Sequence, residues 1–128
     1  MIAQSLAKFL RENANIGAAL HTIAPLVLEP DTDYPAMVYY LSEDDRPPLL
    51  NGGTSSMGRA SGEIDILAES YAAARAAADV VTDEMHDYAG VFGDHTAEQI
   101  KIERDLDGFE NAVMMYRVSL QMVIHYTA

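Results

Sequence analysis

The sequence predicts a single α+β domain in which a mainly antiparallel, twisted sheet carries two helices packed on one face. The chain has 128 residues, the length of one ordinary domain, and 49% of them are hydrophobic, enough to bury a core. Two stretches repeat apolar residues every three or four positions, as amphipathic helices do, and others alternate apolar and polar residues, as strands do. The expected order of elements is α-β-β-β-α-β-β within one domain, residues 1–128.

The first third of the chain predicts one helix and two strands. The helix begins at Ile2 and ends within Asn13–Gly17, because Asn and Gly are common stop signals. A strand over Ile23–Leu28 contains Pro25, which suits the edge of a sheet. A second strand is expected over Ala36–Leu41.

A long flexible loop is expected at about residues 43–58, where Pro, Gly, Ser and Thr are frequent. Loops of this length in a compact domain are commonly functional. Leu49 and Leu50 are its unusual feature, since they either fold back onto the core or stay exposed until a partner covers them.

The middle of the chain predicts a strand followed by the most regular helix. Apolar and polar residues alternate over Arg59–Ala68, which indicates a strand with one buried face. Ser70 is expected to cap the helix that follows. Gly90 is expected to close that helix.

Two strands are expected in the last third. One covers Glu98–Arg104 and leads through an acidic turn, Asp105–Gly108, into the last strand. Apolar residues at the even positions of Met114–Tyr126 indicate a long strand with one buried face, central to the sheet.

The composition excludes several classes of function. With 20 acidic and 8 basic residues the net charge is −12, which argues against affinity-driven binding to DNA, because such binding depends on Lys and Arg at phosphates. The acidity serves solubility alone or, alternatively, repels DNA so that a duplex can slide past. The absence of Cys excludes disulfides, thiolate metal sites and Cys nucleophiles. We see neither a membrane-spanning run nor a signal peptide and expect a soluble protein made inside a cell.

Phosphate-loop and metal motifs are weak. Gly52-Gly53 lacks the preceding strand and following helix of a phosphate loop. Asp83 and His86 share a helix face, with Asp87 and His95 nearby in the sequence, but a metal site needs further converging ligands. We therefore expect no bound metal and no cofactor.

No motif indicates catalysis. Histidines occur at positions 21, 86, 95 and 125, yet no Ser lies in a Gly-x-Ser-x-Gly setting. The paired carboxylates Asp44 and Asp45 lie in the expected loop, where burial would not raise their pKa. We expect no catalytic residues and predict that the chain is not an enzyme.

Several segments, taken in order, resemble a known family. From Arg59 to Val81 an alternating strand passes through a short Ala/Ser-Tyr turn into an Ala-rich helix. The chain also has an amphipathic N-terminal helix, a Tyr34-Pro35 step before Ala-Met-Val-Tyr, and a last strand that opens with Met-Tyr-Arg-Val-Ser-Leu. Over almost its whole length it resembles the tail-completion (tail-terminator or head-tail joining) proteins of long-tailed bacteriophages and phage-like particles; residues 43–58 depart from the family pattern.

The resemblance implies a structural subunit of a ring, usually hexameric, at the head-proximal end of a phage tail tube. Such a ring ends tube polymerisation or joins the tube to the head connector, and DNA passes through its lumen without specific binding. The implied partners are further copies of this chain, the tail tube protein and a head-tail connector, adaptor or stopper protein. The implied location is the tail or neck of a virion assembled in the host cytoplasm, from a virus, a prophage or a gene transfer particle.

We expect two regions to contact these partners, the loop from Glu43 to Met57 and the acidic turn from Asp105 to Glu110. The residues proposed for these contacts are Arg46, Leu49, Leu50, Asp105, Asp107 and Glu110. The alternative is a small cytosolic α+β enzyme or ligand-binding domain acting as a dimer, with a pocket between sheet and helix. A pocket-lining His or carboxylate with a strongly shifted pKa would favour that alternative.

Overall fold

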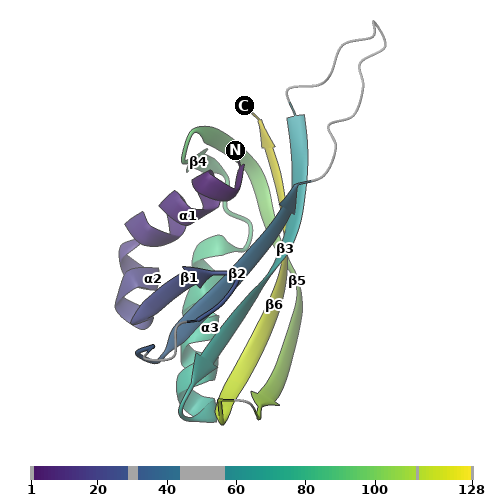
Figure 1. The fold of residues 1–128 in the computed structure, drawn as a ribbon. Helices are drawn as coiled ribbons and strands as arrows, with labels where there is room; N and C mark the ends of the chain where they lie inside the picture. Colours follow the sequence, from purple (N-terminus) through teal and green to yellow (C-terminus); the bar gives the residue numbers. More distant parts are fainter. Residues whose placement is uncertain (1, 29–31, 44–56, 112, 128) are drawn as a thin grey trace, which may run out of the picture.

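A computed structural model describes residues 2–28, 32–43, 57–111 and 113–127, and it confirms the α+β class with a mainly antiparallel sheet (Figure 1). The described helices are α1 (Ile2–Glu12), α2 (Ala14–Ala19) and α3 (Tyr71–Met85). The described strands are β1 (Thr22–Pro25), β2 (Ala36–Glu43), β3 (Met57–Ala68), β4 (Gly90–Phe92), β5 (His95–Glu110) and β6 (Met115–Thr127). Figure 1 shows the helices on one side of a twisted sheet.

The Asn-Gly region after α1 forms a second short helix, which the sequence did not predict. Asn13 ends α1 and also caps α2, because its side-chain oxygen accepts the backbone N–H groups of Asn15 and Ile16, each at 3.0 Å. Asn is among the best N-cap residues, so one residue serves as a stop signal and a start signal. The tight connection lets Ile16 reach the core.

The cap of α3 is as predicted, but the end of the helix is not. Ser70 Oγ accepts the backbone N–H of Ala73 at 3.1 Å. The helix ends at Met85, and Asp87 adopts a left-handed φ of 63° that turns the chain back toward the sheet. Gly90, the expected C-cap, instead begins β4 with a φ of 144°.

The sheet has the order β1-β2-β3-β6-β5-β4 and is antiparallel except for the parallel β1–β2 pair. The last strand, β6, is central as predicted, because β3 and β5 both pair with it over most of its length. The prediction of an acidic turn at Asp105–Gly108 is wrong. These residues continue β5, which pairs with β6 as far as Glu110↔Met115.

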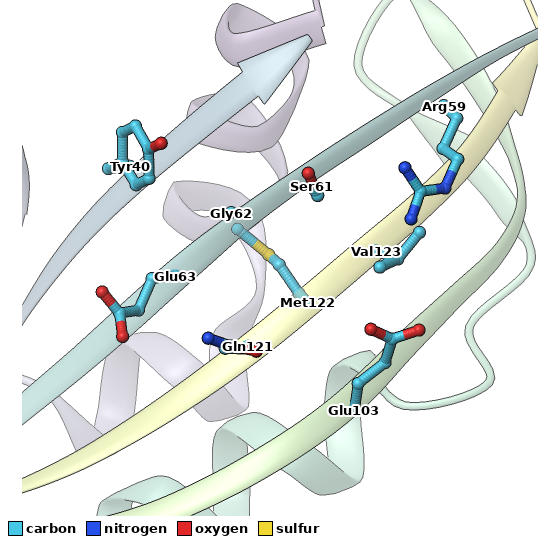
Figure 2. Close-up of a pocket in the computed structure, with 9 residues that line it drawn as sticks. All are labelled: Tyr40, Arg59, Ser61, Gly62, Glu63, Glu103, Gln121, Met122 and Val123. Carbon is cyan, nitrogen blue, oxygen red and sulfur yellow. The ribbon is translucent and has the colours of Figure 1, made fainter. Parts of the chain in front are cut away.

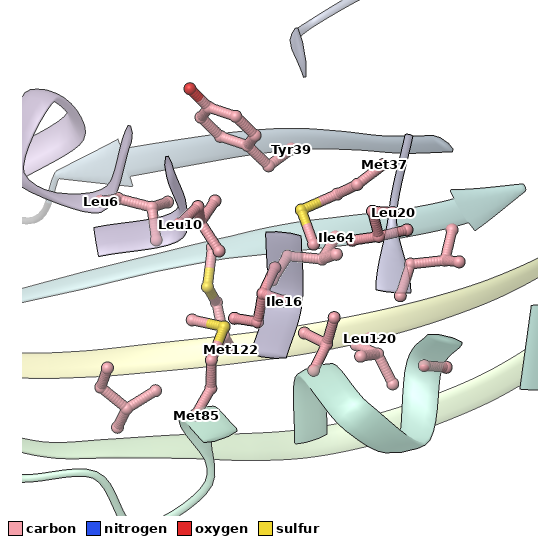
Figure 3. Close-up of a cluster of buried hydrophobic side chains, with 14 of the residues drawn as sticks. Leu6, Leu10, Ile16, Leu20, Met37, Tyr39, Ile64, Met85, Leu120 and Met122 are labelled. Carbon is pink, nitrogen blue, oxygen red and sulfur yellow. The ribbon is translucent and has the colours of Figure 1, made fainter. Parts of the chain in front are cut away.

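The core lies between the helices and the inner face of the sheet (Figure 3). It is built from the apolar stripes of all the described helices and the inward-facing residues of the long strands: Leu6, Leu10, Ile16, Leu20, Met37, Tyr39, Ile64, Met85, Leu120 and Met122 are its labelled members. Gly62 allows β2 and β3 to approach closely, because a Cβ there would lie 2.1 Å from the carbonyl oxygen of Tyr40.

Candidate assembly surface

An arginine on α3 holds the end of β5 against the helix layer. The five guanidinium N–H donors of Arg75 make five hydrogen bonds to carboxylates. Two go to Asp105 at 2.6 and 2.8 Å, two to Asp79 at 3.0 and 3.1 Å, and one to Asp107 at 3.2 Å. Tyr71 adds a hydrogen bond from its hydroxyl to Asp107 at 2.7 Å. We call these five residues the Arg75 cluster.

The Arg75 cluster shifts the titration of its members. Hydrogen bonds from Arg75 lower the pKa of Asp105 below its ordinary value, and the same bonds raise the pKa of Arg75. The hydrogen bond to Asp107 is the main cause of a raised pKa for Tyr71. These shifted groups bind one another at the surface, and the cluster combines three carboxylates with one guanidinium, so its charge at neutral pH is negative.

Exposed apolar side chains gather beside this cluster, at the end of the β5–β6 hairpin. We call the following residues the hairpin-end cluster: Tyr71, Phe109, Val113, Met114 and Tyr116. Tyr116 contacts both aromatic neighbours, with ring centroids 5.1 Å from Phe109 and 6.4 Å from Tyr71. A fully exposed aromatic side chain presents roughly 150–250 Å², so exposures of 39–45% leave roughly 250 Å² of aromatic surface here. Apolar patches of a few hundred Å² on a soluble domain commonly mark contact sites.

The end of β2 and the start of β3 lie at the end of the sheet opposite to the β5–β6 hairpin. β3 pairs with β6 from Met57↔Thr127 at one end to Ala68↔Tyr116 at the other. β2 ends at Glu43 and β3 begins at Met57 at the first end, and the β5–β6 hairpin lies at the second. Figure 1 shows this separation along the strands.

The structure brings together only part of the predicted contact set. Arg46, Leu49 and Leu50 lie outside the described residues. Asp105 and Asp107 lie on one face of β5 with their carboxylates bound to Arg75. Glu110, at the end of that strand, lies 3.3 Å from Arg117. Their contact with partners stays a prediction.

The sequence alone did not predict that Arg75, or the aromatic residues Phe109 and Tyr116, would belong to this surface. The signals were present: Arg75 and Asp79 are four residues apart on a helix, and Asp105, Asp107 and Phe109 alternate as residues of one strand face do. Both signals were obscured because Asp105–Gly108 resembled a turn.

The helix-free face of the sheet carries a shallow hollow (Figure 2). Its lining comes from β2, β3, β6 and β5: Tyr40, Arg59, Ser61, Gly62, Glu63, Glu103, Gln121, Met122 and Val123. One arginine and two glutamates give it mixed charge. This face is therefore the polar counterpart of the face that the helices cover.

Among the residues considered for metal binding, His86 Nε2 lies 3.6 Å from Asp87 Oδ2, whereas His95 has a different partner. No group of three or more His, Cys, Asp or Glu within the described ranges could hold a metal ion. His86 Nδ1 accepts the backbone N–H of Ile102 at 3.0 Å, whereas His95 Nδ1 lies 2.7 Å from Ser5 Oγ. Ser5 belongs to α1 and is only 2% exposed. Its hydrogen bonds with His95 and with the backbone N–H of Asp94 therefore anchor this helix to the β4–β5 turn. None of the helices that the structure describes is long and apolar enough to cross a bilayer.

Comparison with known proteins identifies the fold. No protein-family model matches the chain, and no curated protein matches it significantly. A solved structure titled as the virion of a native gene transfer agent (GTA) particle contains a chain with the same fold, at a TM-score of 0.66 and 19% sequence identity. The match covers 99% of this chain and 92% of that chain, so the likeness extends over the complete fold of both.

Proposed function

We propose that this chain is a structural subunit of the virion of a phage or phage-like particle, in which it forms a ring at the head-proximal end of the tail tube. The observation that carries the proposal is the full-length fold match to a chain of a GTA virion. The sequence resemblance to tail-completion proteins supports the finer assignment to a ring, taken as hexameric, that ends the tube or joins it to the head connector.

The arrangement of the two contact regions supports this role. A ring between tube and connector must offer one surface to each, and in this chain Glu43 and Met57, which flank the expected loop, lie at the opposite end of the strands from the apolar hairpin end. The hairpin end is a contact surface of suitable character, because exposed aromatic and Met side chains are enriched at protein interfaces.

The charge of the chain supports a lumen through which DNA passes. A net charge of −12 repels phosphates, so a duplex would move through such a ring without being held. Assembly with the tube and the connector would then depend on the two ends of the subunit and not on the DNA.

Electron microscopy of particles made with this gene interrupted tests the proposal. We expect filled heads beside detached tails, with overlong tails if the ring ends tube growth and tails of normal length if it joins tube to head. Restoring the intact gene in trans should restore joined particles. Intact, normally tailed particles from the interrupted gene would refute the proposal and favour the small-enzyme or ligand-binding alternative.

A further inference from the structure

β1, at one edge of the sheet, and the second half of β5, near the other edge, lie at the same level along the strands. Four rows of residues run across five strands, from Thr22–Pro25 of β1 through β2, β3 and β6 to Asp105–Gly108 of β5. The first row joins Thr22 to Gly108, and the last joins Pro25 to Asp105. One edge of the sheet can therefore meet the other edge of a second copy without a shift along the strands.

The edge of β5 is covered only over its first half. β4 pairs with β5 near Ala97, and the backbone of Asp87 and Tyr88 then bonds to both backbone groups of Ile100. His86 accepts the N–H of Ile102. Beyond Ile102, no residue that the structure describes makes a backbone hydrogen bond to this edge.

The opposite edge of the sheet has the complementary shape. β1 is an edge strand that pairs only with the first half of β2, Ala36–Tyr39, and no strand in the described part of the chain pairs with this edge of the second half. β1 lies at the hairpin end of one edge, whereas β4 lies at the opposite end of the other edge. With two copies side by side, β1 of one copy would thus face the part of β5 that β4 leaves unpaired in the other.

Strand direction and side chains agree with this fit. β1 and β5 run in opposite directions, so copies placed side by side around an axis along the strands would pair them antiparallel. Just after β1, Leu26 and Val27 are 69% and 70% exposed. Next to the free part of β5 lies a hollow between that strand and α3, lined by Thr82, His86, Ile102, Glu103 and Asp105.

We propose that β1 of one copy adds to the free edge of β5 in the next copy, Thr22–Pro25 opposite Asp105–Gly108, and that Leu26 and Val27 then cover the hollow beside α3. The sheet would thus continue from subunit to subunit through identical, head-to-tail contacts, which close into a ring when the rotation between copies permits. Only this closure rests on the proposed function; the edge contact rests on the register and on the shape of the two edges.

A second copy is the occupant that the edges specify. A free strand edge can accept an extended backbone partner, and β1 of a second copy matches this edge in level and direction. The Arg75 cluster holds the receiving strand from the inner face, so that the edge is presented in a fixed position.

Disulfide trapping tests the contact, because the chain has no Cys of its own. Ala24 and Leu106 lie in the same row, on the same face of the sheet, so Ala24→Cys with Leu106→Cys places two thiols opposite each other across the proposed contact. Opposite residues have Cβ atoms about 4.5–5.5 Å apart, near the reach of a disulfide. The matched control combines Ala24→Cys with Gln121→Cys, which is exposed but lies on the central strand.

Oxidation of the Ala24/Leu106 double variant should give a ladder of dimers, trimers and larger species on a non-reducing gel, in purified protein at high concentration or in assembled particles. A mixture of the two single variants should stop at dimers. No ladder in either preparation, from protein whose circular dichroism is that of the wild type, would overturn the proposal. So would equal linking of the Gln121 control, or efficient dimers of either single variant, since those indicate a symmetric contact.

The result also separates this contact from the proposed function. A ladder together with normally tailed particles from the interrupted gene supports the edge contact and refutes the tail role. Detached tails together with no ladder in protein or particles leave the tail role standing and overturn the edge contact.

Discussion

Replacing Arg75 with Met should loosen the end of β5 while leaving the core intact. The change removes five hydrogen bonds to three carboxylates and keeps the aliphatic part of the side chain. Arg75 is 27% exposed and its partners Asp79, Asp105 and Asp107 are 42–62% exposed, so solvent screens each pair. Exposed pairs contribute roughly 0.2–1 kcal/mol each, which gives a loss of about 1–2 kcal/mol for the three together. A domain of this size should then lose roughly 3–8 °C in Tm.

The assay is thermal unfolding followed by circular dichroism, with Arg11→Met as the matched control. Arg11 is exposed at the end of α1, and its replacement changes the net charge by the same amount without touching the Arg75 cluster. Surface changes of this kind alter stability by less than about 0.5 kcal/mol. The difference between the two variants should shrink in 1 M salt, where the Debye length falls to about 3 Å.

The same difference should depend on pH with a defined sign. Arg75 lowers the pKa of Asp105 in the folded state. The stabilisation is therefore complete above the pKa of an unfolded Asp, about 3.9, and is lost as the pH falls through the lower folded value. The Arg75→Met and Arg11→Met proteins should converge in strong acid. Equal Tm values at neutral pH, or a difference that ignores both salt and acid, would refute this account of the cluster.

Substitutions in three further regions test other parts of the chain. Ser70→Ala removes the N-cap of α3 and should cost about 1 kcal/mol in chemical unfolding, whereas Ser70→Asp should preserve the cap; equal losses for both would contradict this. Gly62→Ala should destabilise the fold severely, seen as loss of soluble protein or a much lower Tm, because its Cβ would clash with the carbonyl of Tyr40. Replacing Leu49 and Leu50 with Ser should leave the monomer folded but weaken assembly on the tube, and unchanged assembly would show that the loop is not a contact region.

Local patterns predicted the elements whose signals lie within the elements themselves. α3 follows from its apolar spacing and Ser70, and the central strand β6 follows from its alternation. Asn13 ends the first helix as predicted, but its second role as the N-cap of α2 was missed. Gly90 was misinterpreted because left-handed glycines occur both at helix ends and before strands.

The end of β5 was mispredicted for a reason that lies outside its own sequence. Asp105-Leu-Asp-Gly resembles a turn, since Asp and Gly are among the commonest turn residues. Arg75, 30 residues earlier, binds both aspartates and offsets this local preference. The predicted contact residues Asp105 and Asp107 thus lie on a strand and not in a turn, and the exposed apolar side chains near them were missed.

The free edges of the sheet could not be predicted from periodicity at all, because they depend on strand order. Nothing in the alternation of β5 indicates that its neighbour β4 has only three residues and leaves most of its length uncovered. Nor does the sequence of β1 indicate that it pairs in parallel with β2 and lies level with the free part of β5. Long-range pairing, and not local preference, determines where such a chain can add a further strand.

The central strands give a physical reason why the two ends of this sheet would move together. β3 and β6 pair along all 12 residues of β3, from Met57 at one end to Ala68 at the hairpin end. Core strands open locally at a much higher free energy than loops do, so the two ends of this ladder keep a fixed relative position. If copies also join edge to edge in the proposed rows, displacement of one hairpin end would move its neighbours. In the proposed ring, the position of each copy would therefore be coupled to that of the next.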